Sequence, residues 1–154
     1  MSNREKKLEA LGYELAKKTP EGALVDPLAV AGDILYASGQ VPFDGDVLMN
    51  RGKVPSQVTM EEATRAAALC AANVLRAVYA YTGSLDKIQR VIRVTGYVNA
   101  DVDFTDCHLV INGASHLFRE IFGEDGRHAR TALSMAQLPL GASVEVEAIF
   151  QLKS

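Results

Sequence analysis

One arginine and one glutamate stand out in the last quarter of the chain, because each has mostly apolar or small neighbours. Arg130 begins a segment with the pattern of a β-strand, and Glu145 lies inside a second such segment, residues 144–148. A buried charge is costly unless it has a partner or a ligand. A guanidinium can bind a carboxylate through two parallel hydrogen bonds, and a partly buried carboxylate can accept a proton from water. Arg130 and Glu145 are therefore the first candidates for chemistry.

Each of these residues also has a purely structural explanation. Arg130 could pair with a carboxylate across a subunit interface, and Glu145 could be a solvent-facing strand residue. Side chains alternate along a strand, so Glu147 is expected on the same face as Glu145. The two carboxylates must therefore be distinguished.

Other common kinds of site have little support. The sequence has no glycine-rich phosphate loop, zinc spacing or nucleophile elbow, and Ser38-Gly39 lacks an Asp/His pair placed to form a triad. His108 and His116 are two helical turns apart with no third ligand, which favours ordinary surface histidines. Cys70, among alanines, is expected to be a buried thiol, and no signature marks Cys107 as a nucleophile. We expect no metal ion and no cofactor.

Length and composition predict one domain with its own core. The chain has 154 residues, of which 48% are hydrophobic. The net charge of −3 and a pI near 5.6 leave no basic footprint for nucleic acid. No apolar run reaches the roughly 18 residues that span a membrane, and the charged N-terminus is not followed by a signal-peptide core. A cytoplasmic protein is expected.

The periodicity predicts an α+β fold of order β-β-α-β-α-β-β, with two helices on one mixed sheet. A further helical segment precedes these elements at residues 3–10. Thr59 and Glu62 fit a capping box before a long alanine-rich helix that Gly83 ends. The remaining predicted elements are strands at residues 28–31, 34–37 and 88–98, a loop at 42–53, a helix at about 106–122, and two final strands joined by a Pro/Gly turn.

Five short motifs occur in an order that is specific to one protein family. They are Ser38-Gly39-Gln40-Val41-Pro42, Asn112, Ala129-Arg130-Thr131, Leu138-Pro139 and Val144-Glu145-Val146-Glu147-Ala148. Together they resemble the RidA/YjgF family of enamine/imine deaminases, some described as endoribonuclease L-PSP and related by fold to one type of chorismate mutase. The resemblance covers about residues 28–152. It suggests an N-terminal extension at residues 1–27 before a domain at residues 28–154.

The resemblance implies a homotrimer with a barrel-like centre, helices outside, and three clefts between subunits. In this family the residue matching Arg130 grips the carboxylate of a 2-imino acid, and the one matching Glu145 lies near the attacking water. No cofactor is required. The residues expected to line the pocket by resemblance are Ser38, Gly39, Asn112 and Thr131. Asn112 could instead bond a neighbouring loop, and Ser38 and Gly39 are expected to shape the pocket through their backbone.

The sequence also departs from the best-known deaminases, which indicates a divergent branch with a reshaped pocket. Val25 stands where those proteins carry a tyrosine, and Ala132 where many carry a cysteine. His128 replaces a proline, and one extra residue lies between Asn112 and Arg130. His128 could share a face with Arg130 and supply a proton, or be a plain surface histidine.

Three functions follow from these features. The first is hydrolysis of reactive 2-imino/enamine acids to 2-keto acids and ammonia. The second is a non-catalytic module that binds a small carboxylate metabolite in the same cleft; Arg130 supports both, whereas a water-activating Glu145 supports only the first. The third, endoribonuclease activity, is disfavoured by the acidic charge balance.

Overall fold

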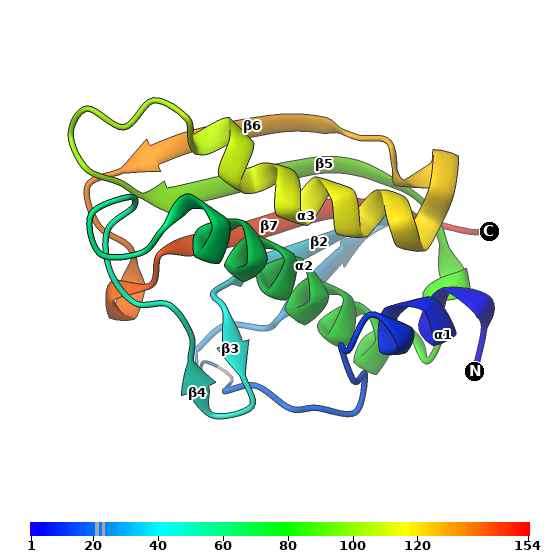
Figure 1. The fold of residues 1–154 in the computed structure, drawn as a ribbon. Helices are drawn as coiled ribbons and strands as arrows, with labels where there is room; N and C mark the ends of the chain where they lie inside the picture. Colours follow the sequence, from blue (N-terminus) through cyan, green and yellow to red (C-terminus); the bar gives the residue numbers. More distant parts are fainter. Residues whose placement is uncertain (21, 23) are drawn as a thin grey trace.

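The computed structural model describes residues 1–20, 22 and 24–154, with helices packed on one face of a mixed sheet (Figure 1). The predicted order β-β-α-β-α-β-β is confirmed for the strands of the main sheet and its two helices, preceded by the predicted N-terminal helix. The elements are α1 (Asn3–Ala10), β1 (Leu28–Ala31), β2 (Ile34–Gln40), β3 (Phe43–Asp44), β4 (Val47–Leu48), α2 (Met60–Thr82), β5 (Ile88–Asn99), α3 (Cys107–Phe122), β6 (Ala129–Met135) and β7 (Val144–Leu152).

The main sheet has the strand order β1-β2-β7-β5-β6. β5 and β6 are parallel, and the other neighbouring pairs are antiparallel. The final two strands exist as predicted, but they do not pair with each other, because β5 lies between them. The chain makes this crossing through a 3₁₀ turn, Pro139–Gly141, in which Leu140 and Gly141 both have positive φ angles.

Local capping interactions set the ends of the long helix. The Thr59 hydroxyl accepts a hydrogen bond from the Glu62 amide, and the Glu62 carboxylate accepts one from the Thr59 amide, so the predicted capping box is confirmed. Gly83 ends the helix in the left-handed conformation, with φ of 75°. The segment at 42–53, expected to be a loop, contains the short hairpin β3–β4, which turns at Gly45.

The core lies between the sheet and the helices. On β7 the alternate residues Val144, Val146, Ala148 and Phe150 are buried beneath the helices, as period-two alternation requires. The alanine-rich helix α2 packs against β7, β2 and α3, in agreement with the expected helices on one mixed sheet. Cys70 is fully buried there, and burial raises the pKa of its thiol well above the ordinary value.

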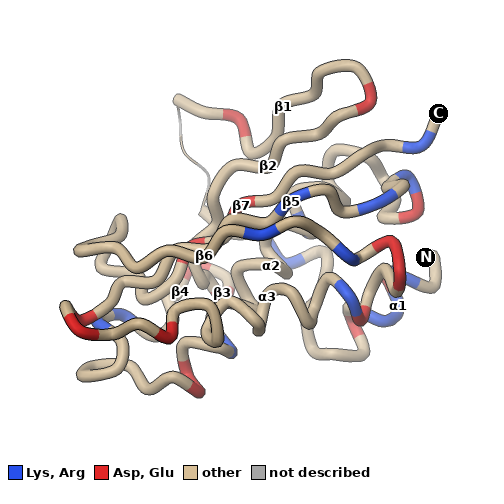
Figure 2. Tube along the Cα trace, turned by 90° about the horizontal axis from the view of Figure 1, so that it is seen from above, with Lys and Arg blue, Asp and Glu red and all other residues tan. Residues whose placement is uncertain are grey.

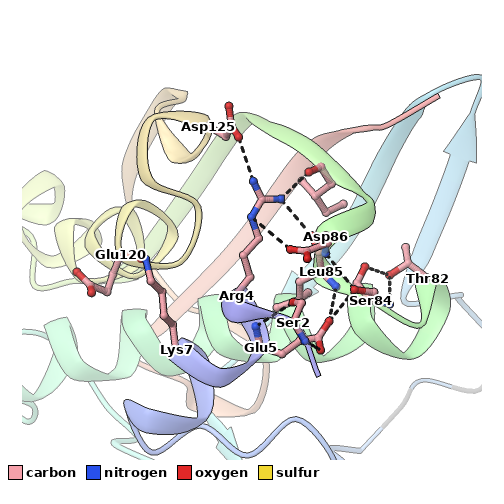
Figure 3. A network of polar contacts seen from close by, with 11 residues as sticks. Ser2, Arg4, Glu5, Lys7, Thr82, Ser84, Leu85, Asp86, Glu120 and Asp125 are labelled. Carbon is pink, nitrogen blue, oxygen red and sulfur yellow. Dashed lines mark hydrogen bonds and ion pairs between the residues drawn. The ribbon is translucent and has the colours of Figure 1, made fainter.

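A polar network fastens the N-terminal helix to the rest of the domain (Figure 3). The Ser84 hydroxyl donates to the Glu5 carboxylate at 2.7 Å, and the Leu85 amide donates to the same oxygen at 3.0 Å. Arg4 pairs with Asp125 at 3.0 Å. Its guanidinium also lies over the ring of Phe122, 4.7 Å from the centroid. Helix α1 is therefore anchored by buried polar contacts.

The opposite face of the sheet carries no layer among the described residues. Figure 2 shows the strands of the main sheet on one side and α2 and α3 on the other. Tyr36 on β2 and Leu133 on β6, which lie on this open face, are 47% and 45% exposed. Acidic and basic residues are interspersed along the trace in the same view. None of the helices described combines the length and apolar character needed to cross a bilayer.

Candidate functional site

Arg130 points from β6 toward helix α3. It pairs in register with the buried Val94 of β5, which places its side chain on the helix side of the sheet. Its Nη1 atom donates to Asn112 Oδ1 at 2.8 Å and to Ser115 Oγ at 3.2 Å. Both hydrogens of Nη1 are thereby used. Nε and Nη2 make no hydrogen bond to the described residues, so one edge of the guanidinium stays available for a carboxylate.

Ser115 connects Arg130 to a histidine. The Ser115 Oγ atom lies 2.9 Å from His128 Nε2, and His128 Nδ1 lies 2.7 Å from the carbonyl oxygen of Gly126. Burial lowers the pKa of His128, the positive charges of Arg130 and Arg119 lower it further, and the contact with Gly126 opposes the shift. His128 and Arg130 thus share a partner on α3.

Ser115 was not among the residues predicted from the sequence, although its spacing from Asn112 pointed to it. Asn112 and Ser115 are three residues apart on α3, so they lie on one face of the helix. Nothing in the local pattern indicates that β6 packs beside that face. The proximity of Ser115 and Arg130 depends on the strand order, which puts β6 at the edge of the sheet.

Glu145 lies on the opposite face of the sheet. It pairs with Tyr97 of β5, and its neighbours Val144 and Val146 face the core. Burial raises the pKa of the Glu145 carboxyl, and the nearby Glu147 carboxylate raises it further. A group of this kind holds its proton more readily than an ordinary glutamate and is a stronger proton acceptor when ionised.

The structure distinguishes the two carboxylates of β7. The Tyr97 hydroxyl donates to Glu147 Oε1 at 3.1 Å, so Glu147 already has a donor. Glu145 makes no side-chain hydrogen bond to any residue described here. The sequence-based expectation that both lie on one face is confirmed. Of the two, Glu145 has more capacity to bind a water or a ligand.

Gly39 lies directly beside Glu145. A Cβ atom at position 39 would lie 3.1 Å from the Glu145 carboxyl carbon and closer still to Oε1. This close approach occurs where the pairing of β2 with β7 becomes irregular, between Ala37 and Gln40. Only a residue without a side chain leaves room for the carboxylate in this position.

The hydroxyl and the amide of Ser38 both form hydrogen bonds with the segment that precedes β1. Its hydroxyl donates to the carbonyl of Asp26 at 2.7 Å, and its amide donates to the carbonyl of Pro27 at 2.9 Å. A cavity of about 650 Å³ opens beside Ser38 and Gly39, and Val25 contributes to its wall. Ser38 therefore contributes to the cavity wall, in keeping with the shaping role expected of it.

Thr131 does not share the pocket of Arg130 through its side chain. Strand alternation turns it to the open face, where Arg93 Nη2 donates to its hydroxyl at 2.6 Å. Any contribution of Thr131 to the site of Arg130 must come from its backbone.

Arg130 and Glu145 are not brought together within one chain. Arg130 lies on the helix side of β6, whereas Glu145 lies on the open side of β7, with β5 between the two strands. The chain offers two separate half-sites: Arg130 with Asn112, and Glu145 with Gly39. Within the described residues, no three His, Cys, Asp or Glu side chains lie close enough to hold a metal ion.

The comparisons with known proteins agree with this architecture. The family described as "YjgF/chorismate mutase-like, putative endoribonuclease" matches residues 5–152. The chain belongs to the RidA/YjgF family. The match begins inside helix α1, whose Leu8 belongs to the same core as the rest of the domain. The division between residues 1–27 and 28–154 stays a prediction.

Proteins similar to this chain come from several organisms. Protein TCP17 of Trypanosoma cruzi is 36% identical over 148 residues, which cover 96% of this chain and 92% of that protein. The crystal structure of Atu1372 from Agrobacterium tumefaciens, of unknown function, has a TM-score of 0.90 and 43% identity, covering 97% of this chain and 92% of that one. The crystal structure of a protein from Shewanella oneidensis MR-1, described as a "putative endoribonuclease", has a TM-score of 0.92 and 28% identity, covering 98% of this chain and 100% of that one. The predicted chorismate mutase-like fold is confirmed.

Proposed function

We propose that this protein hydrolyses 2-imino and enamine acids to 2-keto acids and ammonia. The observation that carries the proposal is the guanidinium of Arg130, fixed through Nη1 by Asn112 and Ser115. Its Nε and Nη2 donors form the side-on edge that fits a carboxylate with two parallel hydrogen bonds. A 2-imino acid presents such a carboxylate next to the carbon that water attacks.

Glu145 is the proposed proton acceptor for the attacking water. The water oxygen bonds to the imine carbon while one of its protons passes to Glu145, and the nitrogen takes up a proton from solvent to give a tetrahedral aminoalcohol. Glu145 then returns its proton to the amino nitrogen, the C–N bond breaks to release ammonia, and the hydroxyl proton is lost to solvent as the C=O bond of the 2-keto acid forms. An enamine first becomes the imine by protonation at carbon. The raised pKa of Glu145 supports this role, because a base is most effective when its pKa approaches the working pH. None of these steps needs a metal ion or an organic cofactor.

The two half-sites must come from different chains to act on one substrate. Arg130 and Glu145 face opposite sides of the sheet, and the open face exposes Tyr36 and Leu133. An exposed apolar sheet face favours association with another copy. We propose a homotrimer in which the Arg130 half-site of one chain meets the Glu145 half-site of its neighbour in each of three clefts.

The experiment that tests the reaction generates imino acids in place from several amino acids with an amino-acid oxidase. The loss of imine is followed with and without this protein, and light scattering reports the oligomeric state in the same buffer. Accelerated loss by a trimer supports the proposal. A stable monomer at micromolar concentration, or imine loss at the uncatalysed rate for every amino acid, contradicts it.

A second candidate is a binding protein for small carboxylate metabolites that does not catalyse a reaction. Val25, at the position of the tyrosine carried by the best-known deaminases, lines the cavity beside Ser38 and Gly39 and supplies no proton there. This function requires only the Arg130 half-site. It predicts saturable binding of a 2-keto acid without any acceleration of imine loss.

A further inference from the structure

We propose that Ser115 and His128 are positioning residues that hold Arg130 in its carboxylate-binding orientation while His128 is neutral, and loosen it when His128 takes up a proton. The inference rests on the proposed role of Arg130 and adds a pH-dependent control to the same half-site. In this proposal His128 controls the orientation of Arg130 and does not donate a proton to the substrate.

The hydrogen-bond partners fix where each proton must be. The Gly126 carbonyl can only accept, so the Nδ1 atom of His128, 2.7 Å away, carries a hydrogen. Arg130 Nη1 can only donate, so Ser115 Oγ accepts from it. The Ser115 hydroxyl hydrogen is then free to point at His128 Nε2, 2.9 Å away. When His128 is neutral, all three contacts are hydrogen bonds and the Ser115 hydroxyl hydrogen also has an acceptor.

Protonation of His128 disrupts this chain at Ser115. A hydrogen on Nε2 would donate to Ser115 Oγ, so the hydroxyl hydrogen would lose its acceptor. A second positive charge would also stand beside Arg130, which already contacts the same oxygen. The charged groups that face His128 are both cations, Arg130 of β6 and Arg119 of α3, and the edge of Phe118 fills another side. The environment therefore favours the neutral ring, and protonation weakens the hold on Arg130.

The sign of the pH effect follows from these contacts. The pKa of His128 lies below the ordinary histidine value, mainly because of burial, so the ring is neutral at neutral pH. Carboxylate binding should be full there and should weaken as the pH falls through the lowered pKa. Glu145 titrates too, but it acts on the water, so its protonation lowers turnover rather than carboxylate affinity.

A ligand-free experiment tests the positioning directly. The Nε–H signal of Arg130 is followed by NMR in the full protein at about pH 7.5 and about pH 4.5, the second value lying below the usual histidine range because the pKa of His128 is lowered. We expect an ordered, slowly exchanging signal at the higher pH that broadens at the lower one. In Ser115→Ala it should be broadened at both. A signal that is unchanged by pH and by Ser115→Ala overturns the proposal, whether or not the protein is an enzyme.

Binding of pyruvate, the simplest 2-keto acid, supplies the second readout. Wild-type affinity should fall about tenfold or more between the same two pH values, because a hydrogen bond to a charged group is weakened. His128→Gln retains a neutral donor and acceptor but does not titrate, so it should bind almost as well as wild type at the higher pH and lose the pH dependence. His108→Gln, at an exposed histidine on helix α3, should behave as wild type.

The outcomes separate this inference from the proposed function. If wild type and His128→Gln lose affinity equally at low pH, the His128 switch is wrong while Arg130 stays the carboxylate ligand. If Arg130 broadens as expected but neither pyruvate binding nor imine hydrolysis is found, the positioning pair stands and the proposed function fails.

Discussion

Gly39 and Glu145 are packed so closely that the glycine has no room for a side chain. A Cβ atom would press on the carboxylate of Glu145 from the neighbouring strand. The conformation of Gly39 is not the left-handed one that disfavours other residues, so the effect of a substitution is steric. The position of the proposed base therefore depends on this glycine.

We predict that Gly39→Ala displaces Glu145 and lowers imine turnover by roughly 10²-fold, since a misplacement of about 1 Å can have that effect. Steady-state kinetics and thermal unfolding measure the two consequences. Gly32→Ala is the matched control, because that glycine has positive φ but open space around it. The control should lose stability and keep its turnover. Full activity of Gly39→Ala would contradict the assignment of Glu145.

Arg130→Lys tests the carboxylate ligand. Lysine keeps the charge but loses the planar fork, so we expect imine hydrolysis to fall at least about tenfold, in line with roughly 1.5–3 kcal/mol for a charge-assisted bond. Arg127→Lys is the control, because Arg127 is exposed and pairs only with Glu124 in the part of the chain described. If Arg130→Lys and Arg130→Ala both stay folded and keep the activity and ligand affinity of wild type, Arg130 is not the carboxylate ligand.

Glu145→Gln separates catalysis from binding. The amide keeps the shape but accepts no proton, so turnover should fall by roughly 10²–10⁴-fold while affinity for pyruvate is retained. In the wild type the raised pKa of Glu145 predicts that turnover declines as the pH falls through that value, starting above the range of an ordinary glutamate. Glu147→Gln removes one cause of the shift and should move the decline to lower pH. Equal turnover in wild type and Glu145→Gln would leave only the binding function.

Glu5→Gln tests the attachment of helix α1. Glu5 is 2% exposed and accepts hydrogen bonds from Ser84 and Leu85. Burial acts to raise its pKa, but the hydrogen bonds from Ser84, Ser2 and Leu85 together outweigh burial and the pKa is lowered. Its stabilisation is therefore present above the ordinary glutamate pKa and lost as the pH falls through the lowered value. We expect a loss of about 1–3 kcal/mol at neutral pH in chemical denaturation, and little difference from wild type in acid.

The matched control for that experiment is Glu9→Gln, a half-buried position on the same helix whose side chain makes no hydrogen bond or ion pair with the described residues. It should change the free energy of unfolding by less than about 0.5 kcal/mol, as surface substitutions usually do. A Glu5→Gln protein as stable as this control at neutral pH would show that the polar network of Figure 3 does not hold the helix.

The sequence by itself determined the features that depend on near neighbours. The capping box of Thr59 and Glu62 and the ending of α2 at Gly83 involve residues a few positions apart, so a local pattern is sufficient to predict them. Strand alternation likewise placed Glu145 and Glu147 on one face. The motif order identified the family and, through it, made Arg130 and Glu145 candidate site residues.

Only the tertiary structure decided how the half-sites are related. The insertion of β5 between β6 and β7, and the alternation within each strand, put Arg130 and Glu145 on opposite faces. Ser115 contacts His128 and Arg130 because the edge strand β6 packs beside α3. No local sequence pattern predicts that packing. Such contacts follow from how separate segments of the chain pair and pack. That arrangement depends on burying the whole sheet under its helices, so the periodicity within any one segment does not encode it.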